Sequence, residues 1–230
     1  MSPSYVLTLL AIVGLGATLV GVVRRRLYRA CFSFPAYAAT VLVTELMILL
    51  WPDRYHVWGF WMGKEALLAL LKVTVALEIA SLSFAAFPGA RATSRWLTAS
   101  ILTATVVAAA VAVYSAAASL DSIAQALHSW LANGTACLFV GVWAVVLYYR
   151  LPLHPFHRAL LRGFVPYMAV FTLALGLVRD LGDGAQSWIA LADGTAYVLL
   201  VVCWAVYVWT YRAQALTPLD LQLQPWRARL

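Results

Sequence analysis

Charged residues are scarce in this chain of 230 residues. They make up 11% of the sequence, whereas about 25% is usual for a soluble domain. Hydrophobic residues account for 64%. No segment is polar enough to form a separate soluble domain, so residues 1–230 are expected to form a single membrane domain.

Cysteine is also rare, and its spacing excludes two classes of site. The three cysteines, Cys31, Cys137 and Cys203, lie far apart, and the sequence contains no CxxC pair. Disulfide frameworks and thiolate metal sites depend on several cysteines at short, regular spacings. We therefore expect neither in this chain.

The motifs of common enzyme classes are missing as well. The sequence has no GxSxG nucleophile elbow, no HExxH, no P-loop or dinucleotide glycine pattern, and no paired acidic motif of a membrane protease. His154 and His157 lie in a short loop with a proline on either side of His154, which favours a solvated basic loop over a metal site. We therefore expect no catalytic residues and no metal centre, and the sequence assigns no cofactor.

Long apolar runs are what the sequence has in abundance. Each run has about the 20 residues that a helix needs to cross ~30 Å of hydrocarbon, where backbone groups must pair within the segment. Pro35 and Pro166 fall in the first turns of the second and sixth runs, where a missing N–H is tolerated. The predicted fold is an all-α polytopic bundle of seven transmembrane helices at about 4–23, 32–51, 60–86, 97–118, 125–149, 164–182 and 188–211.

The arginine residues are distributed unevenly between the two ends of these helices. One side of the predicted membrane holds Arg54 and Arg179, and the other holds all twelve remaining arginines: Arg24, Arg25, Arg26, Arg29, Arg91, Arg95, Arg150, Arg158, Arg162, Arg212, Arg227 and Arg229. The positive-inside rule predicts an external N-terminus and a cytoplasmic C-terminus. We expect a multi-pass protein of the cell inner membrane. The formal charge of +7 then faces anionic lipid headgroups, so we expect no nucleic-acid partner.

Polar side chains inside the predicted spans are the candidates for function, because an ionised group near the bilayer centre costs roughly 2.5–3.5 kcal/mol. Counted from the helix ends, Glu45, Lys72, Asn133 and Asp193 lie at depths that would let them form a polar pocket open to the outside. The alternative is that Glu45 and Lys72 form a structural ion pair that locks the bundle. Glu78 follows Lys72 by six residues and should point the other way.

A short segment occurs twice. Residues 131–136 (LANGTA) resemble residues 191–196 (LADGTA), in helices that run in the same direction. If the two segments are equivalent, Asn133 and Asp193 should point into the bundle, with Gly134 and Gly194 at helix contacts. Apolar sequence produces chance matches, so the sequence leaves open whether this is a true repeat.

The chain resembles uncharacterised bacterial seven-helix integral membrane proteins in several details. These are the basic cluster after the first helix, the Phe34–Pro35 start of the second, Glu78 in the third, and the segment FPGAR at 87–91. In helix number and orientation it is also loosely similar to the seven-helix membrane input region of sensor histidine kinases. That second resemblance implies a sensing role.

Three functions remain open. The chain could be a non-enzymatic binding or sensing module that acts through a partner protein. It could be a structural or accessory subunit of a larger membrane complex, for which the alanine-rich residues 106–118 offer a close helix contact. It could also be a small-solute transporter, which the repeated segment favours, although no helix is broken by Gly or Pro at mid-membrane.

Overall fold

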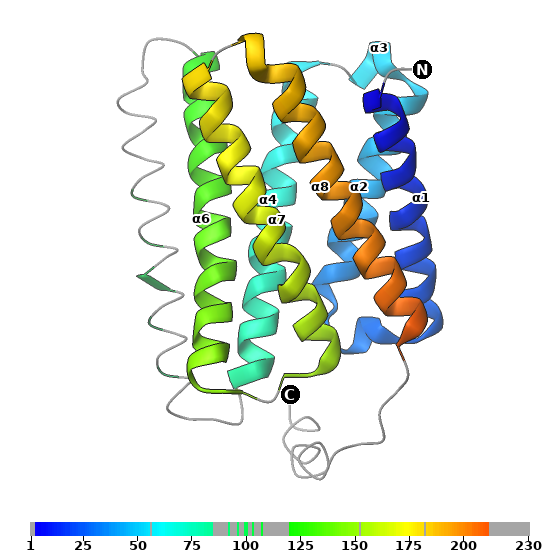
Figure 1. Cartoon of the computed structure of the whole chain (residues 1–230), viewed down its shortest axis with the longest axis vertical. Helices are drawn as coiled ribbons and strands as arrows, with labels where there is room; N and C mark the ends of the chain where they lie inside the picture. Colours follow the sequence, from blue (N-terminus) through cyan, green and yellow to red (C-terminus); the bar gives the residue numbers. More distant parts are fainter. Residues whose placement is uncertain are drawn as a thin grey trace.

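The computed structural model describes residues 3–55, 57–84, 120–151, 153–181 and 183–211, with six further residues between 92 and 107. Regular structure in the described residues is helical (Figure 1). The elements are α1 (Pro3–Arg24), the 3-10 turn η1 (Leu27–Arg29), α2 (Ser33–Leu50), the short α3 (Pro52–Tyr55), α4 (Trp58–Phe84), α6 (Leu120–Tyr148), α7 (Pro155–Leu181) and α8 (Asp183–Thr210).

The predicted spans agree with most of these bounds. For α1, α2, α4, α6 and α8, the predicted and observed ends differ by at most five residues. Such agreement follows because the length of each apolar run is set by the thickness that it must cross. The predicted span 97–118 lies almost entirely outside the described residues.

The sixth predicted span, 164–182, is corrected at its start. Helix α7 begins nine residues earlier, at Pro155, so Pro155 occupies the first turn and Pro166 lies inside the helix. The basic residues of these first turns interrupt the apolar run, which is why the sequence pattern misses them. In the structure Arg158 is exposed on one face of α7, while Leu160 is buried on another.

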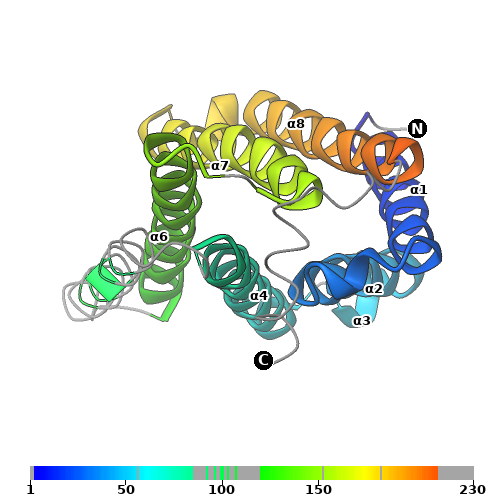
Figure 2. The same cartoon turned by 90° about the horizontal axis from the view of Figure 1, so that it is seen from below.

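The six long helices form a closed ring in the order α1, α2, α4, α6, α7, α8 and back to α1 (Figure 2). Each helix contacts its two neighbours in that order. Four of the neighbouring pairs run in opposite directions, whereas α4 and α6, and likewise α8 and α1, run the same way (Figure 1). The ring brings residues of α2, α4, α7 and α8 to a common interior.

Glycine allows α1 and α8 to approach closely. A Cβ atom on Gly14 would lie 2.6 Å from Val201 Cγ1, and one on Gly21 would lie 2.5 Å from Val208 Cγ1. The two glycines are seven residues apart and therefore share a face of α1. Close approach through small residues is a common way for helices to associate in membranes, where burial of apolar surface supplies little driving force. The contact fixes the position of α8 against the ring.

Large apolar side chains cover the outside of the ring. Val13, Leu70, Leu173 and Leu199 are each more than 60% exposed, which suits a hydrocarbon environment and not water. Within the described residues, α1, α2, α6, α7 and α8 are long and apolar enough to cross a membrane. Helix α4 carries four ionisable residues along its length: Lys64, Glu65, Lys72 and Glu78. These features are those of a membrane protein with transmembrane helices.

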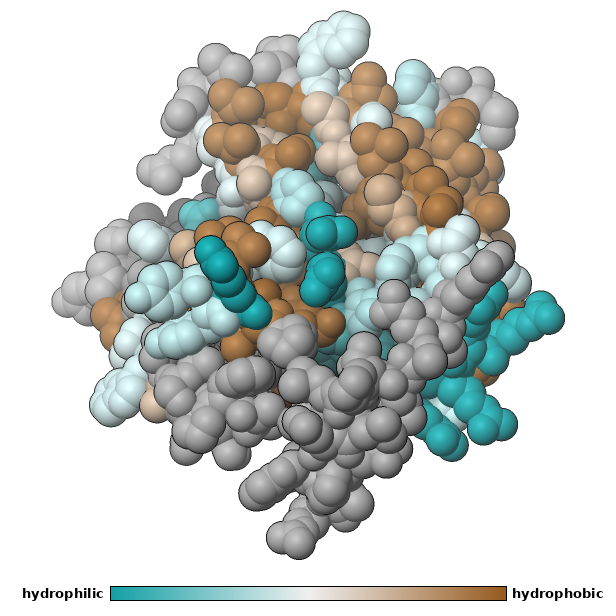
Figure 3. Space-filling view, turned by 60° about the horizontal axis from the view of Figure 1, so that its bottom comes forward, coloured by the Kyte–Doolittle hydropathy of each residue, from teal (hydrophilic) through white to brown (hydrophobic). Residues whose placement is uncertain are grey.

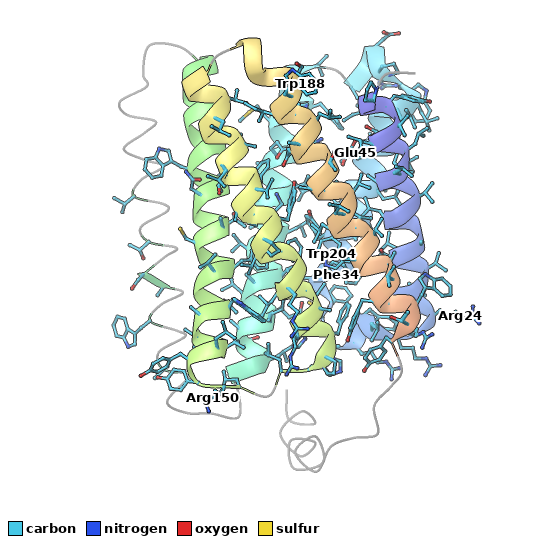
Figure 4. All side chains as sticks on the ribbon, viewed as in Figure 1. Arg24, Phe34, Glu45, Arg150, Trp188 and Trp204 are labelled. Carbon is cyan, nitrogen blue, oxygen red and sulfur yellow. The ribbon has the colours of Figure 1, made fainter. Side chains whose placement is uncertain are left out.

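Polar residues mark one end of the bundle. The space-filling view shows hydrophilic side chains toward the lower end and a mainly apolar surface above them (Figure 3). Arg24 and Arg150 lie at this lower end, whereas Trp188 lies at the opposite end (Figure 4). Connections that are far apart in the sequence therefore present their arginines on one side.

Candidate binding site in the bundle interior

A partly buried ion pair joins α2 to α4 in the upper half of the bundle, where Figure 4 shows Glu45. Lys64 Nζ lies 3.3 Å from Glu45 Oε1 and 3.9 Å from Glu65 Oε1. The structure thus corrects the predicted partner of Glu45, which is Lys64 and not Lys72. Lys72 lies eight residues further along α4, about 12 Å deeper at 1.5 Å per residue, and does not reach the level of Glu45.

Lys72 faces α7 and α8 instead. Its Nζ atom lies 5.3 Å from the centre of the Phe171 ring on α7, a cation–π distance. It also interacts electrostatically with Glu65 on its own helix and with Asp193 on α8. Two of the four predicted pocket residues, Lys72 and Asp193, therefore lie within electrostatic range of each other and of Glu65.

One face of α8 carries four buried polar atoms that have no hydrogen-bond partner among the described residues. These atoms are Asp193 Oδ1, Tyr197 Oη, Trp204 Nε1 and Tyr207 Oη. Successive spacings of four, seven and three residues place all four side chains on a single stripe of the helix. A buried polar atom without a partner costs about 1–3 kcal/mol, so a row of four is unusual for a folded interior.

Tyrosine side chains lie near Asp193, and Tyr167 of α7 interacts with its carboxylate electrostatically. The ring centres of Tyr167 on α7 and Tyr197 on α8 are 5.5 Å apart, and Tyr167 stacks on Phe171 at 6.0 Å. Tyr37 of α2 lies near Tyr197, although the Tyr197 hydroxyl makes no hydrogen bond of good geometry to it. Aromatic faces and a hydroxyl group thus lie beside an unpaired carboxylate oxygen.

Below this polar layer an aromatic cluster fills the interior. Phe34, Phe164 and Trp204 are fully buried and pack edge-to-face or tilted, with ring centres 4.7–6.5 Å apart. Phe139 stacks on Phe164 at 4.6 Å. Figure 4 shows Phe34 and Trp204 at nearly the same height, well below Glu45. The polar layer is therefore separated by close-packed rings from the end that carries the arginines.

Asn133 is not part of the site. It is exposed on α6, whereas its neighbour Ala132 and the following Thr135 are buried. Adjacent residues of a helix point about 100° apart, so the rotation of α6 that buries Ala132 turns Asn133 outward. The prediction that Asn133 points into the bundle beside Asp193 is wrong.

The repeated segments agree locally but differ in their surroundings. Thr135 donates a hydrogen bond to the Leu131 carbonyl at 2.6 Å, and Thr195 donates to the Leu191 carbonyl at 2.7 Å. Thr135 is buried and Thr195 is exposed. A Cβ atom on Gly194 would lie 3.2 Å from Leu7 Cδ1, so Gly194 lies at a helix contact with α1 as expected. The two helices turn different faces of the same local sequence toward the interior.

Glu78 has a role that sequence reasoning missed. Its carboxylate accepts hydrogen bonds from the backbone N–H groups of Phe32 at 2.7 Å and Ser33 at 2.8 Å, and from the Ser33 hydroxyl. The cap residue Phe32 offers no side-chain oxygen, and the first turn of α2 has no acid. Glu78 supplies the missing acceptor from another helix. Two features of the sequence could have predicted this contact: the start of α2 has no capping residue of its own, and an acid lies at a similar depth in another helix.

The loop histidines are also corrected. His157 is 4% exposed, and its Nε2 atom lies 2.7 Å from the Ala30 carbonyl oxygen. His154 Nδ1 accepts a hydrogen bond from the backbone N–H of Phe156 at 3.2 Å, which caps the first turn of α7. The predicted solvated loop is thus a packed connection that ties α7 to the η1 turn.

No protein-family model, no curated protein and no solved structure matches this chain.

Proposed function

We propose that the chain is a seven-span protein of the bacterial inner membrane that binds a small polar solute inside its helix ring. In this proposal it has no catalytic activity, its N-terminus is outside, and it acts as a sensing module through a partner membrane protein. The observation that carries the proposal is the pair of unpaired polar atoms in the upper part of α8, Asp193 Oδ1 and Tyr197 Oη, the first of which belongs to a carboxylate that interacts electrostatically with Lys72. A solute would supply the hydrogen-bond partners that the described side chains do not.

Seven spans are supported by the directions of α4 and α6. Phe84 ends α4 at the lower end of the bundle, and Leu120 begins α6 at the upper end (Figure 1). The chain must therefore pass from one end to the other between these two residues. The arginines at the lower end support a cytoplasmic assignment of that side.

Binding is better supported than passage through the bundle. The aromatic cluster of Phe34, Phe164 and Trp204 closes the interior below the polar layer. In addition, α8 is continuous from Asp183 to Thr210, without the half-helix break that is common at transporter sites. Among the described residues, these packed rings therefore separate a solute at Asp193 from the arginine side.

A sensing role is supported by what α8 connects. Asp193 and Tyr197 lie in its upper part, and Arg25 of α1 holds its lower end by hydrogen bonds to the Trp209 carbonyl, at 2.8 Å, and to the Tyr211 carbonyl. A helix is stiff along its axis, so a shift of α8 at the solute would move these carbonyls as well. The lower end of α8 is where a partner would detect the shift.

Native mass spectrometry of the protein purified in mild detergent tests the proposal. We expect one non-lipid small molecule to be retained by the wild type and lost from Tyr197→Phe, which removes one unpaired hydroxyl. Tyr5→Phe is the matched control, because Tyr5 is exposed on α1. If the spectra instead show no retained solute, and other membrane proteins at a fixed ratio to this chain, the protein is an accessory subunit of a complex.

A further inference from the structure

The charges of the polar layer do not balance. Among the described side chains of the upper interior there are three carboxylates (Glu45, Glu65 and Asp193) and two ammonium groups (Lys64 and Lys72), spread over about 12 Å of depth along α4. Lys64 forms an ion pair with Glu45 at 3.3 Å and a longer one with Glu65 at 3.9 Å. With all five groups ionised, the layer holds one excess negative charge. An unbalanced charge in a low-dielectric interior is costly, and either a proton or a bound cation would offset it.

The excess charge belongs at Asp193. Its Oδ1 atom is buried and has no hydrogen-bond partner among the described residues. Lys72 interacts with it electrostatically, but Lys72 also interacts with Glu65 and lies over the Phe171 ring. The Tyr197 hydroxyl, also unpaired, follows Asp193 by one helical turn and offers a second acceptor oxygen.

The walls of the layer suit an organic cation better than a metal ion. Tyr167, Tyr197 and Phe171 present aromatic rings, whose faces attract ammonium groups and tolerate alkyl chains. A hard metal cation needs a shell of about six oxygen atoms, and the described residues hold no cluster of three or more His, Cys, Asp or Glu that could bind a metal.

We propose that the solute of this site is a small primary amine, bound as its ammonium cation. The ammonium N–H groups donate to Asp193 Oδ1 and to the Tyr197 hydroxyl oxygen, and the alkyl part packs against the Tyr167 ring. This inference rests on the proposed function and adds the chemical class of the solute.

Thermal unfolding of the purified protein, followed by tryptophan fluorescence, tests the chemical class. The protein is titrated at equal ionic strength with ethylammonium chloride, sodium chloride, sodium acetate or glycine. We expect a saturable rise in Tm with ethylammonium alone, of about 2–4 °C when its concentration reaches roughly five times Kd. An equal rise with sodium would overturn the proposal, because a metal ion would then suffice.

Two variants locate the effect. Asp193→Asn should abolish the rise in Tm with ethylammonium. Asp53→Asn is the control, because it makes the same change of charge at an exposed residue of α3, and it should leave the rise intact. Tyr197→Phe should weaken the rise in Tm, and this variant tests the site if Asp193→Asn does not fold. A full response in both site variants would contradict the site.

The remaining outcomes separate this inference from the proposed function. Stabilisation by glycine or acetate, but not by ethylammonium, would keep the solute-binding function and overturn the amine. Stabilisation by none of the four solutes, together with no retained solute in native mass spectrometry, would overturn both.

Discussion

Glu78 and Ser33 join α4 to the beginning of α2: the Glu78 carboxylate accepts the Ser33 backbone N–H at 2.8 Å. The first N–H groups of a helix have no partner within the helix, and the helix dipole favours a negative charge beside them. In this chain the acceptor comes from a residue 45 positions away, so the same contact caps one helix and fixes the depth of another.

Glu78→Ala is expected to destabilise the protein. It leaves two backbone N–H groups without an acceptor, at a cost of about 1–3 kcal/mol, which corresponds to a Tm lower by roughly 2–4 °C for each kcal/mol. Glu78→Gln keeps one acceptor oxygen and should lose less. Thermal unfolding in detergent measures both, and equal Tm values for wild type and Glu78→Ala would contradict the capping role.

Removing Lys64 alone should cost more than removing its ion pair. Lys64→Leu leaves the Glu45 carboxylate without its 3.3 Å partner in a partly buried position, with an expected loss of about 1–3 kcal/mol. The double variant with Glu45→Leu should recover most of the loss. If Glu45 were instead paired with Lys72, Glu45→Leu would rescue the Lys72→Leu variant and not Lys64→Leu. Both double-mutant cycles should therefore be measured.

Gly163→Ala should destabilise the contact between α7 and α8. The new Cβ atom would lie 2.6 Å from Leu200 Cδ1 and 2.7 Å from Trp204 Nε1, and overpacking of this kind costs about 1–3 kcal/mol. Gly176→Ala on the same helix is the control, because nothing lies within 4 Å of its Cβ position. That control should be neutral, or more stable by up to about 1 kcal/mol. A Gly163→Ala variant as stable as Gly176→Ala would argue against the close helix approach.

The Cys31 thiol should resist alkylation in the folded protein. Burial, with the nearby Glu78 charge, raises the pKa of Cys31 from 9.0 to about 12. A raised pKa keeps the thiol protonated, so at pH 9 about a thousandth is thiolate, against about half in the unfolded chain. Iodoacetamide labelling followed by mass spectrometry should modify Cys31 only after unfolding. A cysteine introduced at the exposed Arg26 is the positive control; comparable native labelling at both positions would contradict the burial of Cys31.

The arginine distribution predicts the topology directly. A reporter fused after Leu230 should be cytoplasmic, and a cysteine introduced at Asp183, where α8 begins, should react with an impermeant reagent from outside. Labelling of position 183 that requires opened membranes would reverse the assigned orientation.

The partners of the polar side chains were the least predictable part of the site. The sequence identified Glu45, Lys72 and Asp193 because ionisable residues are rare within apolar runs. It paired Glu45 with the wrong lysine, since the depth of a residue in one helix relative to another depends on the connecting turn, here α3 and the residues around it. The role of Glu78 and the buried position of His157 were missed for the same reason: each depends on a backbone group far away in the sequence.

The sequence by itself determined that this chain consists of long apolar helices with arginines at one end, because backbone pairing within a segment and transfer from water to lipid are properties of the segment alone. The tertiary structure decided which face of each helix points inward. Asn133 and Asp193 occur in nearly identical segments, yet one is exposed and the other lies beside Lys72. That difference arises because the rotation of a helix about its axis is set by the packing of its neighbours, and α6 and α8 have different neighbours in the ring.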